Sequence, residues 1–111
     1  GASSYSSNSS YVPSSLTTVI ITGGSEIAAN AFYNCRYITS IVIPSTVYSI
    51  GSSAFYGCNS LGYVFYEGEE SAWNGISGYN NVTATVYYYS ESEIYDGNYW
   101  HYDEYGIPAI W

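Results

Sequence analysis

The chain has 111 residues, of which nine are acidic and only one, Arg36, is basic, so its formal net charge is −8. A chain of this length forms one domain at most, and a single base cannot neutralise the phosphates of a nucleic acid or the headgroups of an anionic membrane. The 20% aromatic content, with 16 tyrosines, excludes the class of disordered proteins, which are poor in aromatic side chains. No apolar run approaches the 18 residues that would predict a transmembrane helix, so membrane insertion is not expected.

Residues 1–11 are rich in serine and show no apolar periodicity, which is typical of a linker or an extended arm. Asn8 opens an Asn-Ser-Ser triplet and Asn81 an Asn-Val-Thr triplet, and both fit the acceptor pattern for N-glycosylation. The two asparagines are therefore candidate glycan sites. Because the chain has no signal peptide and no initiator Met, we expect it to be a processed or trimmed piece of a longer precursor.

A unit of 23 residues is repeated within residues 12–89. The nine residues from Ile27 to Cys35 (IAANAFYNC) return 23 positions later as Ile50 to Cys58 (IGSSAFYGC). Self-similarity at a constant period in this range is the mark of a solenoid, in which each repeat covers the apolar face of the next. The sequence therefore predicts a short solenoid of parallel β rungs.

Each unit is expected to begin with a short strand, because its first residues alternate and are rich in β-branched side chains. Residues 82–89 read as the strand of the last rung. The equivalent positions of the three earlier strands are Leu16, Val19 and Ile21, then Ile38, Ile41 and Ile43, then Leu61, Val64 and Tyr66.

After each strand the chain should turn and then form about one turn of helix, with Ser52 as the N-cap and Gly57 or Asn34 as the stop. Phe32 and Phe55 are predicted to point inward from these turns and to stack rung on rung. Such a shared column would make each rung depend on its neighbour for stability.

Cys35 and Cys58 occupy the same position in neighbouring rungs and complete this predicted core stack. Rungs about 4.8 Å apart would bring their Cα atoms within disulfide range, but the side chains should point the same way and not at each other. We favour two buried free thiols with a structural role, and a disulfide is the alternative. The spacing fits no zinc motif.

Residues 90–111 are predicted to form an aromatic C-terminal cap. Segments 98–102 and 106–111 read as a β-hairpin that closes the C-terminal end of the core. Just before this region, a short helix around Trp73 is expected to cover the same end. The N-terminal end has no equivalent cap, which predicts contact with upstream repeats or with another copy.

The stretch from Ile43 to Cys58 (IPSTVYSIGSSAFYGC), followed by LGYVFY at residues 61–66, resembles the BspA-type leucine-rich repeat of cell-surface proteins. The resemblance covers roughly residues 12–66, and residues 97–111 resemble the end of many such proteins. It implies a short leucine-rich-repeat solenoid on the cell surface or outside the cell. It also implies attachment to host or matrix proteins or to other microbes.

We therefore expect a non-catalytic, extracellular structural and adhesion module that binds protein or glycan partners. The alternative is a self-assembling subunit of an extracellular, glycosylated filament, built by head-to-tail stacking of solenoids as a homo-oligomer. Four tyrosines are candidates for the binding surface, because tyrosine makes contacts at low entropic cost. The alternative is that these tyrosines only cover the side of the solenoid and bind nothing. They are Tyr33, Tyr56, Tyr87 and Tyr89.

No residue pattern points to catalysis or to a bound cofactor. His101, the one histidine, has no nucleophile or orienting acid indicated beside it. The acidic clusters match no known calcium loop, so weak calcium binding is the most that they predict. Paired carboxylates could hydrolyse a glycoside, and Glu69 and Glu93 are the candidates for such a pair, but we predict that the protein is not an enzyme.

Overall fold

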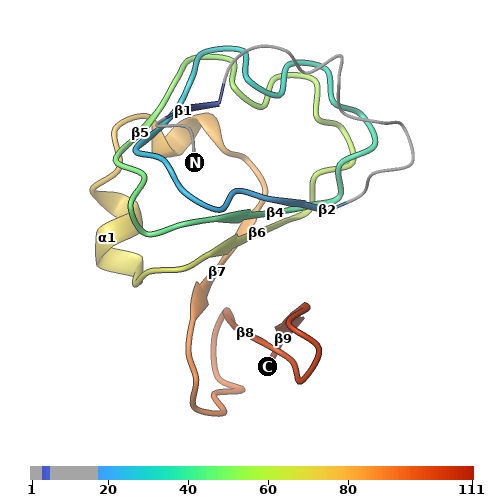
Figure 1. Ribbon diagram of the computed structural model, residues 1–111, viewed down its shortest axis with the longest axis vertical. Helices are drawn as coiled ribbons and strands as arrows, with labels where there is room; N and C mark the ends of the chain where they lie inside the picture. Colours follow the sequence, from blue (N-terminus) through green and yellow to red (C-terminus); the bar gives the residue numbers. More distant parts are fainter. Residues whose placement is uncertain (1–3, 6–17) are drawn as a thin grey trace.

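The computed structural model describes residues 4–5 and 18–111, and in it the repeats form a stack of parallel strands (Figure 1). The larger sheet has six strands in the order β2-β4-β6-β7-β8-β9. These strands are β2 (Thr18–Ile20), β4 (Ser40–Ile43), β6 (Tyr63–Tyr66), β7 (Thr85–Tyr89), β8 (Tyr99–Tyr102) and β9 (Pro108–Ile110). All neighbours in this sheet pair in parallel except β8 and β9.

The register of the sheet is the one that the repeat predicts. Val19 pairs with Ile41, Ile41 with Val64, and Val64 with Val86. Equivalent residues of successive repeats therefore lie on top of one another, so the predicted parallel pairing is confirmed. Leu16 and the rest of the range 6–17 lie outside the described residues, as does most of the serine-rich arm.

A second sheet, which the sequence analysis did not predict, lies across the core from the first. Its strands have two residues each and run in parallel in the order β1-β3-β5. They are β1 (Ser4–Tyr5), β3 (Glu26–Ile27) and β5 (Ser49–Ile50). Two residues are too few to show an alternating pattern, so nothing in the sequence distinguishes these strands from the turns that flank them.

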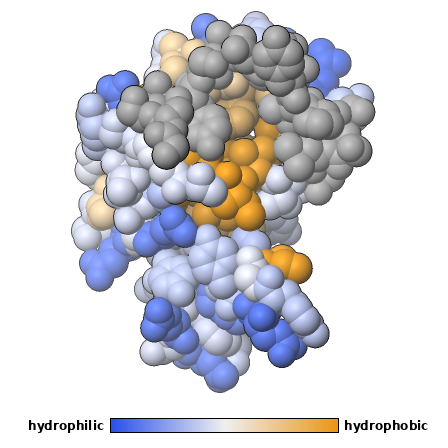
Figure 2. All heavy atoms as spheres, in the orientation of Figure 1, coloured by the Kyte–Doolittle hydropathy of each residue, from blue (hydrophilic) through white to orange (hydrophobic). Residues whose placement is uncertain are grey.

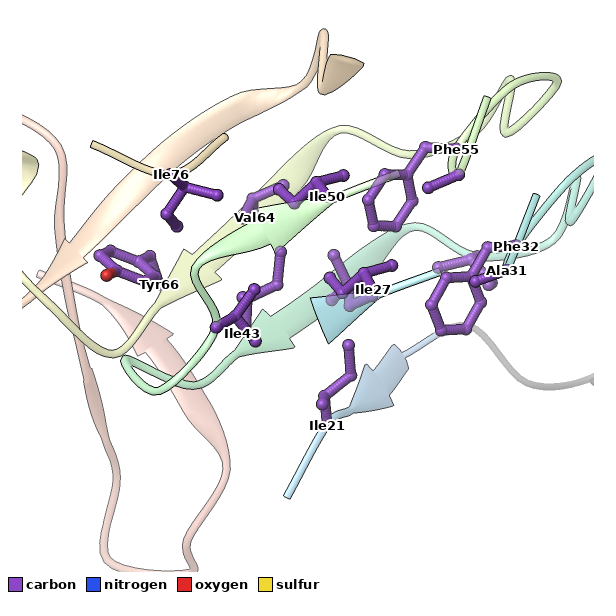
Figure 3. Packing of buried hydrophobic residues seen from close by; sticks show 14 of the residues in the cluster. Ile21, Ile27, Ala31, Phe32, Ile43, Ile50, Phe55, Val64, Tyr66 and Ile76 are labelled. Carbon is purple, nitrogen blue, oxygen red and sulfur yellow. The ribbon is translucent and has the colours of Figure 1, made fainter. Parts of the chain in front are cut away.

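The main core fills the space between the two sheets. Ile27 lies on Ile50, and Phe32 lies on Phe55 with ring centroids 5.5 Å apart and planes 8° from parallel (Figure 3). Because strand side chains alternate between faces, Ile41 and Ile43 of β4 point into this core, as do their partners in β6, Val64 and Tyr66. Each rung thus buries the apolar surface of the next one.

The helical turn expected in each repeat does not form. Residues 28–35 and 51–58 make successive hydrogen-bonded turns instead. Asn30, Asn34 and Ser53 have φ values of 61°, 58° and 58°, and Gly57 has 80°. Left-handed residues at this spacing are incompatible with a right-handed helix. In the first turn, alternate backbone N–H groups bond within the turn and the others bond to the next rung.

The C-terminal end of the main core is closed by the chain between β6 and β7. This segment contains α1 (Glu70–Asn74) and the short 3-10 helix η2 (Tyr79–Asn81). Trp73 of α1 is 3% exposed and packs against the ring of Tyr66, with centroids 5.2 Å apart. The short helix and its Trp73 therefore lie where the sequence predicted, over the end of the core.

The C-terminal hairpin does not close that end, contrary to the prediction. β8 and β9 do form the expected antiparallel pair, but they extend the six-stranded sheet and fold over the face that is turned away from the main core (Figure 1). We call this the strand face. There Trp100, which is completely buried, packs with Val42 and Phe65 in a second apolar cluster, and its Nε1–H donates to the carbonyl oxygen of Tyr66 at 2.7 Å.

Candidate binding surface

The turns of the two repeats carry an exposed pair of tyrosines. Tyr33 and Tyr56 stack with ring centroids 5.3 Å apart and planes 17° from parallel. They are 41% and 63% exposed, whereas the phenylalanine before each of them is buried. Neighbouring residues point to opposite sides of the turn, so a repeated Phe-Tyr pair produces one inner and one outer aromatic column. We call Tyr33 and Tyr56 the tyrosine column.

The tyrosine column ends at an open notch of about 510 Å³, on the side of the second repeat that faces the C-terminal end. The rings of Phe55 and Tyr56 form one wall. Its other lining side chains include Ser53, Leu61, Asn81 and Thr83. The third repeat has no Phe-Tyr turn, because the chain after β6 runs through α1 and η2 instead. The notch is the space that such a turn would fill.

Asn81 lies at the edge of this notch, and its side-chain amide donates two hydrogen bonds. Its Nδ2 donates to the carbonyl oxygens of Ile50 and Gly51, both at 3.2 Å. The strand β5 is already paired at this edge by a single parallel bridge between Ser49 and Ser77, and the two bonds of Asn81 add to that pairing just beyond it. A glycan on Nδ2 would replace one of the two hydrogens and break one bond. Glycosylation of Asn81 stays a prediction, and Asn8 lies outside the described residues.

The two cysteines form no disulfide with each other in the structure, and Cys35 is buried and Cys58 half-buried. The Cys58 thiol donates to the carbonyl oxygen of Phe32 at 3.0 Å. Burial raises the pKa of Cys58 to about 11. Since the thiolate is the nucleophilic form, Cys58 is a poor nucleophile at neutral pH, and the thiols pack beside the phenylalanine stack.

The other two candidate tyrosines, Tyr87 and Tyr89, lie half-buried on the strand face. Tyr89 packs edge-on against Trp100 at 5.3 Å, and the ring centroid of Tyr87 lies 5.9 Å from that of Phe65. The hairpin therefore covers much of the surface that they would offer to a partner. The structure separates them from the tyrosine column, which projects from the turns.

A smaller groove of about 270 Å³ remains on the strand face, between β2 and the turn of the hairpin. Ile20 and Ile107, which are 46% and 57% exposed, both line it. Figure 2 shows a large apolar patch in the middle of the stacked repeats and a smaller one at the side of the hairpin. Each of four successive strands carries an apolar residue at its outward-facing position. This pattern was the signal in the sequence from which a covered strand face could have been predicted. Those residues are Ile20, Val42, Phe65 and Tyr87.

The acidic residues and the histidine make local contacts in the structure. The Tyr102 hydroxyl donates to the Glu67 carboxylate at 2.7 Å, and burial together with this bond raises the pKa of Tyr102. Glu93 accepts a hydrogen bond from Tyr95, and the ring of His101 stacks on Trp111 at 3.5 Å. Within the described ranges, no three His, Cys, Asp or Glu side chains gather as a metal site. Weak calcium binding stays a prediction.

A stack of parallel strands that buries equivalent apolar residues defines a repeat fold of the leucine-rich type. Residues 25–71 match the family described as the BspA type leucine rich repeat region (6 copies). The resemblance to BspA-type repeats is confirmed for this part of the chain. In the described part of the chain, no helix has both the length and the apolarity needed to cross a bilayer.

One similar solved structure is a leucine rich cell surface protein from Faecalibacterium prausnitzii A2-165. It is 41% identical, the match covers 57% of the present chain, and the TM-score is 0.54. The chain spans 17% of the length of that protein. No curated protein matches the chain. Both comparisons therefore concern the repeats, which are similar to those of a leucine rich cell surface protein.

Proposed function

We propose that the protein is a non-catalytic, extracellular structural and adhesion module, a short leucine-rich-repeat solenoid that binds protein or glycan partners through its repeats. The observation that carries the proposal is the exposed, pre-stacked tyrosine column formed by Tyr33 and Tyr56. Tyrosine offers a large contact area with a polar tip and loses little conformational entropy on binding. The match to the BspA-type repeat family and the description of the solved neighbour as a cell surface protein support the location.

The tyrosine column is favoured over the strand face as the binding surface. Trp100 and the hairpin bury the strand face at Val42 and Phe65, so a partner would first have to displace the hairpin. The column needs no such change, because its two rings already stand 41% and 63% exposed. The net charge of −8 favours partners that are neutral or basic over polyanions.

The test is an adhesion assay with a double variant, Tyr33→Ser with Tyr56→Ser. Binding of the labelled protein to surfaces coated with matrix proteins, to whole microbial cells and to immobilised glycans is expected to fall at least tenfold. The control is Tyr37→Ser with Tyr105→Ser, which removes two tyrosines that are 59% and 79% exposed elsewhere. Equal binding by the wild type and by both variants on every surface would contradict the proposal.

A second candidate is the subunit of an extracellular filament formed by head-to-tail stacking of solenoids. The position of β2 favours it, since β2 is the edge strand of the larger sheet among the described strands and an edge can pair with another chain. The other edge strand, β9, argues against a filament. Its Pro108 has no backbone N–H, so one hydrogen-bond donor that would face a neighbouring chain is missing. Sedimentation of the isolated chain tests this candidate: growth in size with concentration would support the filament, and a monomer at all concentrations would exclude it.

A further inference from the structure

We infer that the notch beyond Phe55 and Tyr56 is a docking site for a peptide segment of a partner protein, which binds there in place of a third Phe-Tyr turn. This inference rests on the proposed function and deepens it, because it names the class of partner and the backbone atoms that recognise it. The argument comes from the contact that the molecule already makes between its own two turns.

That internal contact is a row of backbone hydrogen bonds. The N–H groups of Asn30, Phe32 and Asn34 donate to three carbonyl oxygens of the second turn, at 3.2, 2.8 and 2.6 Å. The acceptors are the alternate residues Ser52, Ala54 and Tyr56. One face of the first turn thus recognises a peptide backbone through donors spaced two residues apart.

The second turn repeats this face, but no described backbone bonds to it. The residues 23 positions later are Ser53, Phe55 and Gly57, and their N–H groups have no acceptor in the part of the chain that the structure describes. All three residues line the notch. The left-handed conformation recurs as well, since Ser53 and Gly57 have φ values of 58° and 80° where Asn30 and Asn34 have 61° and 58°.

One aromatic ring at the notch is also open to a further layer. Phe55 lines the notch but is buried, whereas Tyr56 beside it is 63% exposed. A ligand with an aromatic side chain in register with Tyr56 would continue the tyrosine stack, whose present centroid spacing is 5.3 Å. Offset or parallel aromatic pairs of this kind stabilise a contact by roughly 0.5–1.5 kcal/mol beyond the area that they bury.

The spacing of the donors selects a peptide over a small anion. In anion-binding nests, successive N–H groups converge on one atom. Here the donors belong to alternate residues, and their equivalents in the first turn bond to three separate carbonyl groups. A backbone with alternate carbonyls in reach therefore satisfies all three, as in strand-addition complexes where main-chain bonds supply affinity.

The test uses a synthetic peptide with the sequence of residues 49–59 and the change Cys58→Ser, added to the full-length protein. Amide resonances of Ser53, Phe55 and Gly57 are expected to shift on titration, and their hydrogen exchange is expected to slow at least tenfold. Amides of Asn30, Phe32 and Asn34 should be protected with or without peptide. A scrambled peptide of the same composition is the control.

Two variants locate the site. Thr83→Arg places a large side chain on an exposed wall of the notch and is expected to weaken peptide binding at least tenfold. Ser92→Arg adds the same charge to an exposed loop outside the lining of the notch and is expected to have no effect. Circular dichroism of both variants checks that the fold is retained.

The inference is overturned if the peptide at millimolar concentration leaves the three amides unchanged, or if Thr83→Arg binds it as well as wild type. It is also overturned if a soluble oligosaccharide shifts these amides when the peptide does not, or if they are protected in a self-associated form of the free protein. Its failure is separable from that of the proposed function. If adhesion is lost when the tyrosine column is changed, the proposed function is supported even if the peptide does not bind.

Discussion

The two faces of the six-stranded sheet are buried in different ways. The inner face belongs to a core in which each rung supplies equivalent residues, such as Phe32 and Phe55 in the turns. The strand face is covered by one late segment, in which Trp100 reaches Val42 and Phe65. A core made by repetition spreads its stability over every rung, whereas a cluster made by one side chain depends on that side chain. The comparison predicts that damage to the two faces will have different consequences.

The largest effect is expected from Phe32→Ala, in the middle of the repeated core. Truncating a buried phenylalanine costs about 3–5 kcal/mol of unfolding free energy, and Phe32 is only 4% exposed. Because the rungs share this column, the whole stack should be destabilised in one transition. Urea denaturation followed by circular dichroism measures the loss. An unchanged midpoint would contradict the predicted loss, and two separate transitions would show that the rungs unfold independently.

Trp100→Ala is expected to act more locally. It removes a fully buried indole and the bond from its Nε1–H to Tyr66, so the local cost is also about 3 kcal/mol or more. We expect β8 and β9 to lose hydrogen-exchange protection while β4 and β6 keep theirs, because the inner core contains no hairpin residue. Loss of protection in all four strands together would mean that the two faces form one cooperative unit.

Asn81→Ala should have a smaller effect, at the end of the short sheet. The change leaves the carbonyl oxygens of Ile50 and Gly51 without the side-chain donor that bonds them. Two such bonds near the surface contribute about 1–2 kcal/mol. Thermal unfolding measures the loss, with Asn59→Ala, on an exposed part of the notch, as the control. If both changes have the same effect, the two bonds of Asn81 do not stabilise this edge of the short sheet.

The smallest effect is a pH dependence of the strand face. Burial and the bond to Glu67 raise the pKa of Tyr102 in the folded protein. A group whose pKa is raised on folding adds stability below its unfolded pKa, which is about 10 for tyrosine, and this contribution is lost as the pH rises toward the folded pKa. Stability should therefore fall above pH 10 and fall less steeply in Tyr102→Phe. Equal slopes for the two proteins between pH 9 and 11 would contradict this.

Much of the inner core could be predicted from the sequence, because a period of 23 residues states which side chains are equivalent. Stacking of Phe32 on Phe55 and pairing of Ile41 with Val64 follow from that equivalence. The helical turn was predicted wrongly for a local reason. Asn30, Asn34 and Ser53 adopt positive φ, and these residue types carry no certain sign of it, although asparagine is enriched there.

The candidate site could be predicted only in part. The alternation of Phe and Tyr indicated an outer tyrosine column, and the structure places Tyr33 on Tyr56. The notch beside it was not predicted, because it exists only where the third repeat fails to supply a turn. The cover over Tyr89 was also missed, since the contact with Trp100 joins residues whose spatial relation no short-range pattern encodes.

The sequence by itself determined the stacking of the repeats, since a rung repeated at constant spacing can bury its apolar side chains only against its own equivalent. Only the tertiary structure decided where the stack ends and which face the hairpin covers. Those outcomes depend on single contacts across the molecule, such as Asn81 with Ile50 and Trp100 with Tyr66. Each of these contacts occurs once in the molecule, so the 23-residue repeat cannot predict them.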